Sequence, residues 1–403
     1  MANFELMREL NRKNTTKIVL LVLDGLGGLP LESGGPTELE AANSTHLDRL
    51  ARDSALGQII PILRGITPGS GPAHLSLFGY DPLSYAVGRG VLEASGIGMP
   101  LQEGDILARG NFCTIDAEGK IIDRRAGRIP TDQALPIAEK LQNITLPGVE
   151  TEVRVVKEHR FALALRGEGL SPNIEDTDPQ QTGVPPLPAL AKDAESQHAA
   201  DLINQWLQKA LDILSDEPKA NCVTLRGFST DPKLPKYADI YGLKAACIAV
   251  YPMYRGVSSL VGMQVLDVHG DMPEDEFAVL KENWDAYDFF FVHIKKTDST
   301  GEDGNFQGKS SYIELVDQAM PFLMELNPDV LAITGDHSTP AKMAMHSWHP
   351  VPFLLWAPKF GRPDDQVVFG ETACAKGGLG TFMATDIMPL LLAHAGRLEK
   401  FGA

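Results

Sequence analysis

The chain has 403 residues, of which 43% are hydrophobic and 22% are charged, as is usual for a globular protein. This length allows a large hydrophobic core and favours two domains. The formal net charge is −17, which argues against a nucleic acid or an anionic membrane as the main partner. A small anionic substrate remains compatible with this charge, because it needs only a local basic pocket.

The N-terminal sequence MANFELMRELNRKNTTK carries mixed charge and has no apolar signal core. No apolar run approaches the roughly 18–20 residues of a membrane-spanning helix. The chain has four cysteines, which are Cys113, Cys222, Cys247 and Cys374. They are far apart in the sequence and form no C-x-x-C motif, so neither a disulfide framework nor a thiolate metal site is indicated. We therefore expect a cytoplasmic protein.

Four short apolar runs predict buried parallel strands. They are KIVLLVLDG (17–25), FFFVHI (289–294), VLAITGD (330–336) and VPFLLWAP (351–358). Each run is rich in Val, Ile, Leu or Phe and ends in polar or turn residues, as central strands do. Helical patterns accompany them at 309–326, where Pro321 interrupts the spacing, and at 385–397. This alternation predicts an α/β fold with a mostly parallel sheet.

The middle of the chain has a different pattern. Its predicted elements are a possible hairpin at 152–167, a Pro- and Asp-rich loop at 171–190 and an amphipathic helix at about 193–214. Short alternating strands of this kind indicate an α+β domain. We expect this domain to be an insertion over 106–240. The segments 1–105 and 241–403 would together form the discontinuous α/β domain.

Polar residues stand at the ends of the predicted strands. Asp24, Asp298 and the pair Asp336-His337 each follow an apolar run, and His346 precedes the last one. In an open α/β sheet, ligands bind at the carboxyl ends of the strands. Carboxylates and imidazoles gathered there could bind one or two divalent metals such as Mn²⁺ or Zn²⁺. A lone Asp after a strand is more often a turn or cap residue, so only the joint pattern favours a metal site.

A candidate nucleophile lies in GITPGSGPAHLSLFGYDP (65–82). The Gly-Ser-Gly-Pro turn places Pro72 where it suits the first turn of a helix, and Ser70 near the helix N-terminus. Backbone N–H groups there favour phosphate, and a nearby metal would make the hydroxyl a nucleophile. The alternative is that Ser70 only caps the helix. His74, one turn later, could contact the site or anchor the helix.

Several basic residues could bind an anion. Those of the insertion are Arg124, Arg125, Arg128, His159, Arg160 and Arg226, and Arg255 follows it. Guanidinium groups bind phosphate and carboxylate in bidentate fashion. Any single arginine is more often a solvated surface residue, but a set of them in the insertion of an acidic chain suggests an anion site.

Taken together, these segments resemble the 2,3-bisphosphoglycerate-independent phosphoglycerate mutases of the archaeal type, a branch of the alkaline phosphatase superfamily. The matching motifs are LVLDGLGG, GITPGS…AHLSLFGYDP, GRGVLEASGIGM, IDRRAGRI, EHRFALALRGEGLS…DTDP, LKAACIA, HIKKTD…DGN, TGDHSTP, HSWHPVPFL and ACAKGGLG. They occur in family order from about residue 17 to 397, so the resemblance covers nearly the whole chain.

The resemblance implies an alkaline-phosphatase-like core, a substrate-binding insertion and two divalent metal ions. We expect Mn²⁺, with Mg²⁺, Co²⁺ or Zn²⁺ as alternatives, and no 2,3-bisphosphoglycerate cofactor. The implied reaction interconverts 3-phosphoglycerate and 2-phosphoglycerate, a small phosphorylated carboxylate, and Ser70 matches the serine that takes the phosphoryl group. The implied ligands are Asp24, Ser70, Asp336 and His337 for one metal, and Asp298 and His346 for the other. The candidate substrate-binding residues are Arg124, Arg128, His159, Arg160, Arg226 and Arg255.

The chain departs from the family pattern at two places. Glu302 stands where the family usually has His, four residues after Asp298, and an oxygen ligand there would favour Mn²⁺ or Mg²⁺ over Zn²⁺. The same role could fall to Asp303. Gly71-Pro72 stands where many members carry Asp-Thr, which would change the surroundings of the serine. His349 adjoins the start of the last strand, and we do not expect it to bind metal.

Two alternatives to a mutase stay open. One is a metal-dependent phosphohydrolase, in which water and not glycerate resolves the phosphoserine. The other is a non-catalytic relative with a weakened metal site, an idea prompted by Glu302.

Overall fold

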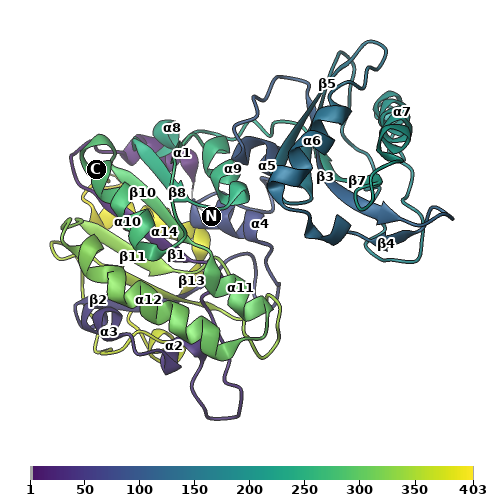
Figure 1. The fold of residues 1–403 in the computed structure, drawn as a ribbon. Coiled ribbons are helices and arrows are strands. Elements are labelled where there is room, and N and C mark those ends of the chain that lie inside the picture. The colour runs from purple at the N-terminus through teal and green to yellow at the C-terminus, as the bar shows by residue number, and fades with distance from the viewer. Residues whose placement is uncertain (1–2, 403) are drawn as a thin grey trace. The chain divides into compact units, whose positions relative to one another are not determined.

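The computed structural model describes residues 3–402, which form two compact units (Figure 1). Val87–Lys233 forms the second unit, and the described residues on either side of it form the first. The insertion therefore starts earlier than residue 106, because α5 (Arg89–Gly96) packs on the strands of the second unit. It also ends earlier than residue 240, because α8 (Tyr237–Tyr241) packs on α1 (Phe4–Leu10) of the first unit.

The first unit contains an eight-stranded sheet. Its strands, in spatial order, are β13 (Gly380–Met383), β2 (Ser54–Ile60), β12 (Val351–Trp356), β11 (Val330–Thr334), β1 (Ile18–Leu23), β10 (Phe289–Ile294), β8 (Ala245–Ala249) and β9 (Gln264–Leu266). The run from β11 to β9 is parallel, and β13 is parallel to β2. The predicted α/β fold with a mostly parallel sheet is thus confirmed.

The prediction that 351–358 forms a parallel strand is wrong. β12 is antiparallel to both of its neighbours, β11 and β2. The chain turns back after β11 through a loop without a helix, whereas parallel neighbours are usually joined by a crossover that contains a helix. β12 is nevertheless buried along almost its whole length, so its apolar composition is that of a central strand.

Helices cover both faces of this sheet. They are α1 (Phe4–Leu10), α2 (Glu38–Ala41), α3 (Thr45–Arg52), α4 (Ser70–Leu77), α8, α9 (Pro252–Leu260), α10 (Pro273–Glu282), α11 (Lys296–Glu302), α12 (Phe306–Met324), α13 (Glu371–Cys374) and α14 (Ile387–His394), with 3₁₀ turns at Trp284–Ala286 and Ala384–Asp386. Pro321 lies inside α12, so it does not end the helix predicted at 309–326.

Alternation along β10 shows how the two faces are filled. Phe290 and Val292 join the hydrophobic core beneath α10 and α12. Phe289 and Phe291 point to the other face, where Phe291 packs edge-on against Phe78 at a centroid distance of 4.9 Å. Because helices bury both faces, every position of the strand is apolar except His293.

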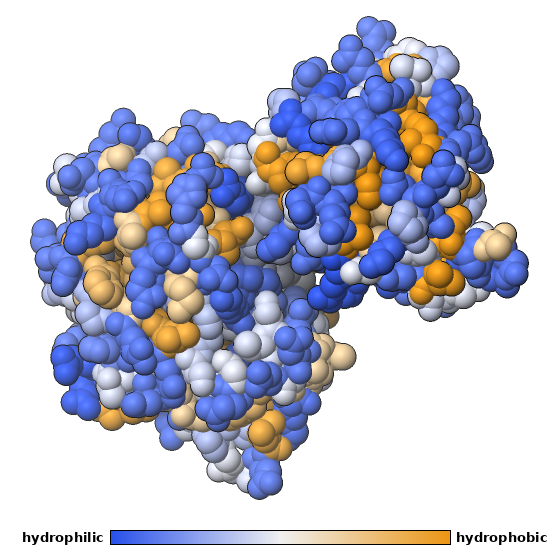
Figure 2. Space-filling view, viewed as in Figure 1, coloured by the Kyte–Doolittle hydropathy of each residue, from blue (hydrophilic) through white to orange (hydrophobic). Residues whose placement is uncertain are grey.

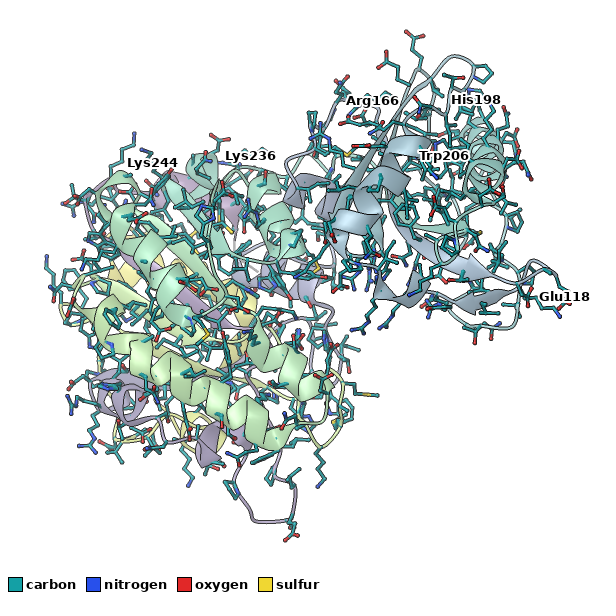
Figure 3. The ribbon with its side chains drawn as sticks, in the orientation of Figure 1. Glu118, Arg166, His198, Trp206, Lys236 and Lys244 are labelled. Carbon is teal, nitrogen blue, oxygen red and sulfur yellow. The ribbon has the colours of Figure 1, made fainter. Side chains whose placement is uncertain are left out.

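The second unit is an antiparallel sheet packed against helices. Its elements are α5, β3 (Ile106–Ile115), β4 (Ile121–Asp123), a 3₁₀ turn (Ala126–Arg128), α6 (Thr131–Leu141), β5 (Glu150–Lys157), β6 (Arg160–Arg166), α7 (Gln197–Leu214) and β7 (Cys222–Ser229). The sheet order is β4-β3-β6-β5, with β7 also paired to β3. Trp206 of α7, labelled in Figure 3, is fully buried near Phe161. The predicted hairpin and amphipathic helix are confirmed.

The surface agrees with the charged composition. Hydrophilic residues cover most of the face shown in Figure 2, and the hydrophobic patches between them are small. Among the described residues, no helix combines the length and apolar character needed to cross a membrane.

Glu276 generates a stability prediction. It lies buried on α10, and burial followed by repulsion from Asp275 and Asp271 raises its pKa from 4.5 to about 8. The stability that the protonated carboxyl preserves is therefore complete below pH 4.5 and is lost as the pH rises towards 8. Glu276→Gln should raise the free energy of unfolding at pH 8.5 by on the order of 2 kcal/mol and change little at pH 4.5.

Chemical denaturation at the two pH values checks this prediction. Glu274→Gln, an exposed position on the same helix, is the control and should leave the pH dependence unchanged. An equal effect of Glu276→Gln at both pH values would contradict the shifted pKa.

Candidate active site

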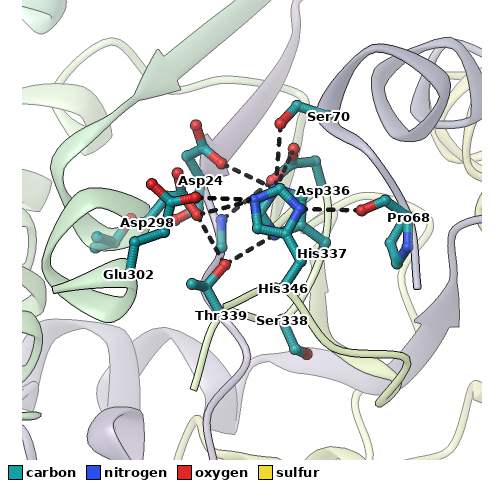
Figure 4. A network of polar contacts seen from close by, with 12 residues as sticks. Asp24, Pro68, Ser70, Asp298, Glu302, Asp336, His337, Ser338, Thr339 and His346 are labelled. Carbon is teal, nitrogen blue, oxygen red and sulfur yellow. Dashed lines mark hydrogen bonds and ion pairs between the residues drawn. The ribbon is translucent and has the colours of Figure 1, made fainter. Parts of the chain in front are cut away.

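Two loops at the carboxyl ends of β1 and β11 bring the first group of side chains together (Figure 4). β1 lies between β10 and β11, so Asp24 follows one central strand and Asp336 follows its neighbour. Gly25 allows the loops to approach, since a Cβ there would lie 2.5 Å from the Thr339 hydroxyl oxygen. Its φ of +64° also lies in the region that favours glycine.

Asp24, Asp336 and His337 form a group whose ligand atoms lie within 4.8 Å of one another, and all three are fully buried. Among the described residues, Oδ1 of Asp24 and Oδ2 of Asp336 receive no hydrogen bond. A buried carboxylate oxygen without a partner is costly. A divalent cation would satisfy both oxygens, so these residues fit a metal ion.

Burial and the short distances within this group also shift the pKa values of Asp336 and His337. Burial, and then repulsion from Asp24, raises the pKa of Asp336 well above its ordinary value. Burial lowers the pKa of His337 well below its ordinary value, which keeps the imidazole neutral. A neutral imidazole is the form that binds a metal. A bound cation would also remove the repulsion between the two carboxylates.

A chain of hydrogen bonds fixes the His337 ring. Its Nδ1 lies 3.0 Å from the Thr339 hydroxyl, which donates to Oδ1 of Asp298 at 2.8 Å. The hydroxyl therefore accepts from Nδ1–H, and Nε2 keeps its lone pair. Nε2 lies 3.2 Å from Oδ2 of Asp336 and 3.4 Å from Oδ1 of Asp24, so it points at the first group. Thr339 couples that group to the second.

The second group consists of Asp298, His346 and again His337. The His346 ring stacks on His337 at 3.6 Å between centroids, and its Nδ1 donates to the Pro68 carbonyl at 3.0 Å. Nε2 of His346 therefore faces Oδ1 of Asp298, 3.5 Å away. The metal-candidate carboxylates and imidazoles predicted from the strand ends thus come together, and His337 is within reach of both groups.

Glu302 and Asp303 are the two carboxylates that could take the place of the family's His, and they differ in position. Glu302 places Oε1 3.7 Å from Nε2 of His346, and its side chain is 55% exposed. Burial, and then repulsion from Asp298, raises its pKa. Asp303 is exposed at the end of α11. His349 stacks on Trp348, bonds to the Ser347 hydroxyl and belongs to neither metal group among the described residues.

Ser70 is the first residue of α4, and Gly69 occupies the N-cap position without a side-chain hydrogen bond. The serine therefore does not serve as the helix cap. Its hydroxyl lies 3.4 Å from Nε2 of His337 (Figure 4). His74 anchors this turn and contacts the site, since its Nδ1 donates to the Ser70 carbonyl at 2.8 Å and lies 3.4 Å from Oδ2 of Asp336.

Sequence reasoning missed the residues that support Asp24. The Tyr254 hydroxyl and the Lys295 ammonium both donate to its Oδ2, the latter at 2.9 Å. The His293 ring stacks on Tyr254 at 3.7 Å and places Nε2 3.5 Å from the same oxygen. The one available signal was His293, a polar residue inside an otherwise apolar strand.

Lys309 was missed as well. It is fully buried, and its ammonium donates to the carbonyls of Gly25, Gly27 and Thr339 at 2.7, 2.9 and 2.9 Å. Burial lowers its pKa, while Glu38 acts in the opposite direction. These bonds tie the loop after β1 to the loop after β11, so Lys309 fixes the distance between the two halves of the first group.

The basic residues that the sequence suggests for anion binding belong to both units. Arg255 lies on α9 of the first unit and pairs with Asp267 at 2.7 Å. In the second unit, Arg124 makes a two-bond contact to Asp178, at 3.2 and 2.8 Å. Arg226 contacts Asp176 at 3.1 Å.

His159 marks where positive charge gathers in the second unit. It is buried, and burial lowers its pKa to about 4. The positive charges that lower it further are those of Arg160, Arg109, Arg125 and Arg128. The predicted residues Arg128, His159 and Arg160 therefore lie in one cationic neighbourhood, to which Arg109 of β3 adds a residue that the sequence did not single out.

Comparison with known proteins decides the family. Residues 51–220 match the model of the 2,3-bisphosphoglycerate-independent phosphoglycerate mutases. A Thermus thermophilus relative named as a probable 2,3-bisphosphoglycerate-independent phosphoglycerate mutase is 53% identical over 404 residues, covering 99% of both chains. The chain belongs to the 2,3-bisphosphoglycerate-independent phosphoglycerate mutase family. The predictions of this family and of an enzyme are thus confirmed.

Other relatives agree with this assignment. A Thermotoga maritima protein of the same name is 50% identical, again over 99% of both chains. The solved structure of a Pyrococcus horikoshii protein aligns with a TM-score of 0.83 and 30% identity, covering 96% of this chain and all of that one. The cofactor-independent phosphoglycerate mutase of Thermoplasma acidophilum aligns with a TM-score of 0.72 and 31% identity, covering 94% and 100%.

Glu302→Ala tests whether this carboxylate binds metal. We expect about tenfold weaker Mn²⁺ binding at one site and no change at the other, because Glu302 lies beside His346 and away from Asp24. Calorimetric titration with Mn²⁺ gives the affinity and the stoichiometry. Asp303→Ala is the neighbouring control, and an unchanged titration of Glu302→Ala would show that Glu302 is not a ligand.

Proposed function

We propose that the protein interconverts 3-phosphoglycerate and 2-phosphoglycerate through a phosphoserine at Ser70, without 2,3-bisphosphoglycerate. The observation that carries this proposal is the position of the Ser70 hydroxyl, 3.4 Å from Nε2 of His337, a residue shared by both candidate metal groups. The names of the relatives support the substrate.

Asp24, Asp336 and His337 would hold one metal ion, and Asp298, His346 and Glu302 the other. The ions, for which the oxygen-rich ligand set favours Mn²⁺, would supply positive charge to the phosphoryl oxygens and to the serine oxygen. Ser70 stands at the start of α4, where the first backbone N–H groups favour a phosphoryl group as well.

The reaction consists of two phosphoryl transfers. In the first, the Ser70 oxygen forms a bond to phosphorus while the bond to one glycerate oxygen breaks, and that oxygen gains the proton that the serine hydroxyl loses. The glycerate then reorients, and in the second transfer its other hydroxyl takes the phosphoryl group back, while its proton returns to the serine oxygen. Preorganised positive charge lowers the barrier to both steps.

Glycerate must stay bound between the two transfers, because water would otherwise hydrolyse the phosphoserine. This requirement calls for cationic groups that recognise a carboxylate. The second unit, with Arg124, Arg128, His159, Arg160 and Arg226, is our candidate for the substrate-binding domain. Burial is the main cause of the lowered pKa of His159, and the further lowering by the neighbouring arginines supports a concentration of positive charge there. Arg255 is the candidate from the first unit.

The activity is tested by incubating the purified protein with Mn²⁺ and 3-phosphoglycerate, without bisphosphoglycerate. We expect 2-phosphoglycerate to form, which coupling to enolase detects. Parallel measurement of inorganic phosphate identifies a hydrolase. Phosphate release without 2-phosphoglycerate would overturn the mutase proposal in favour of a phosphohydrolase.

Ser70→Ala tests the nucleophile. We expect the mutase rate to fall by at least about a thousandfold, because no other hydroxyl would replace the serine oxygen, while Mn²⁺ still binds. Ser76→Ala is the matched control: Ser76 lies buried in the same helix, and among the described residues its hydroxyl has no hydrogen-bond partner. Retained turnover in Ser70→Ala would remove this serine as the nucleophile.

A further inference from the structure

Lys295 contacts both candidate metal groups. It immediately precedes α11, and its ammonium lies 2.9 Å from Oδ2 of Asp24 and in direct contact with Oδ2 of Asp298. Asp24 belongs to one group and Asp298 to the other, and Figure 4 shows the two carboxylates near each other. The ammonium therefore bridges two buried carboxylates that like charge would otherwise push apart.

The surroundings hold this ammonium in place. Its side chain is 21% exposed, and the rings of Tyr251 and Tyr254 lie 5.9 and 5.7 Å from Nζ, within the range of cation–π attraction. Tyr254 also donates to Asp24, so one packed unit holds the lysine and its carboxylate.

The charge balance of the site indicates that Lys295 does more than bridge the two carboxylates. The four carboxylates that would hold the two ions, Asp24, Asp298, Asp336 and Glu302, carry four negative charges when ionised. Two divalent ions would only cancel these charges, whereas a phosphoryl group carries about −1.5 to −2. The Lys295 ammonium leaves the site with a net positive charge, which is opposite in sign to that of the phosphoryl group.

We propose that Lys295 is a positioning residue that acts as a fixed cation of the site: it bridges Asp24 and Asp298 and adds the positive charge that a phosphoryl dianion needs. This role rests on the proposed function for the identity of the anion. It makes two distinct predictions, since the ammonium competes with metal ions for the carboxylates but cooperates with them in attracting phosphate.

The test compares Lys295→Met with Lys296→Met. Lys296 is the adjacent lysine, but its ammonium pairs with the exposed Asp271 and lies over Tyr312. In Lys295→Met we expect unchanged Mn²⁺ stoichiometry with equal or tighter affinity, because Asp24 and Asp298 lose a competitor. Binding of inorganic phosphate to the Mn²⁺-loaded protein should weaken about tenfold. Lys295→Arg should recover most of that loss, and Lys296→Met should match the wild type.

Calorimetry measures both affinities without turnover, so the test stands even if the mutase proposal fails. Loss of Mn²⁺ and phosphate together would mean that Lys295 only holds the loops, and would overturn the inference. Unchanged phosphate affinity would overturn it as well. Should Lys295→Met not fold, Lys295→Gln, which is also uncharged, takes its place with the same expected and contrary outcomes.

Discussion

Repulsion among three buried carboxylates is the constraint on which the rest of the site depends. Asp24, Asp298 and Asp336 lie near one another with almost no solvent, and burial followed by repulsion from Asp24 raises the pKa of Asp336. Such an arrangement persists only if positive charge and rigid surroundings offset it. Divalent ions are the natural counter-charge, and the oxygens that lack hydrogen bonds are where they would bind.

The sheet supplies the rigidity. β1 pairs in parallel with both β10 and β11, so residues from positions 24, 298 and 336 of the chain meet at one edge. Lys309 holds the loops after β1 and β11 together by donating hydrogen bonds to three backbone carbonyls. Thr339 links His337 to Asp298. The first interaction sets the separation of the loops, and the second sets the orientation of a ring that both metal groups share.

The carboxyl ends of the central strands could be predicted because each is marked by a short stretch of sequence. The apolar runs predict the strands, and polar residues just after a run must lie at the carboxyl edge of the sheet. This reasoning identifies Asp24, Asp298 and Asp336 as site residues. The direction of β12 was not predictable in this way, since an apolar run buried on both faces looks alike in either direction. The insertion boundaries were also misplaced, because α5 is assigned by its packing and not by its composition.

The lysines Lys295 and Lys309 show most clearly which site residues cannot be predicted from sequence patterns. Lys295 and Lys296 are adjacent and chemically identical, yet one bridges two buried carboxylates and the other pairs with an exposed one. Lys309 stands among the polar residues that begin a helical pattern, and nothing local separates it from a surface lysine. Which lysine becomes buried depends on the carboxylates that other strands bring near it, which is a property of the sheet order.

The same principle reconciles an acidic chain with an anionic substrate. A net charge of −17 describes the whole molecule, but potential at a site depends on charges within about a Debye length, roughly 8 Å at physiological salt. In the second unit, burial and then the arginines around His159 depress its pKa, although the chain is acidic overall. In the first unit, Lys295 keeps positive charge among the carboxylates themselves. Local segregation of cations is therefore compatible with the proposed phosphate chemistry in an acidic chain.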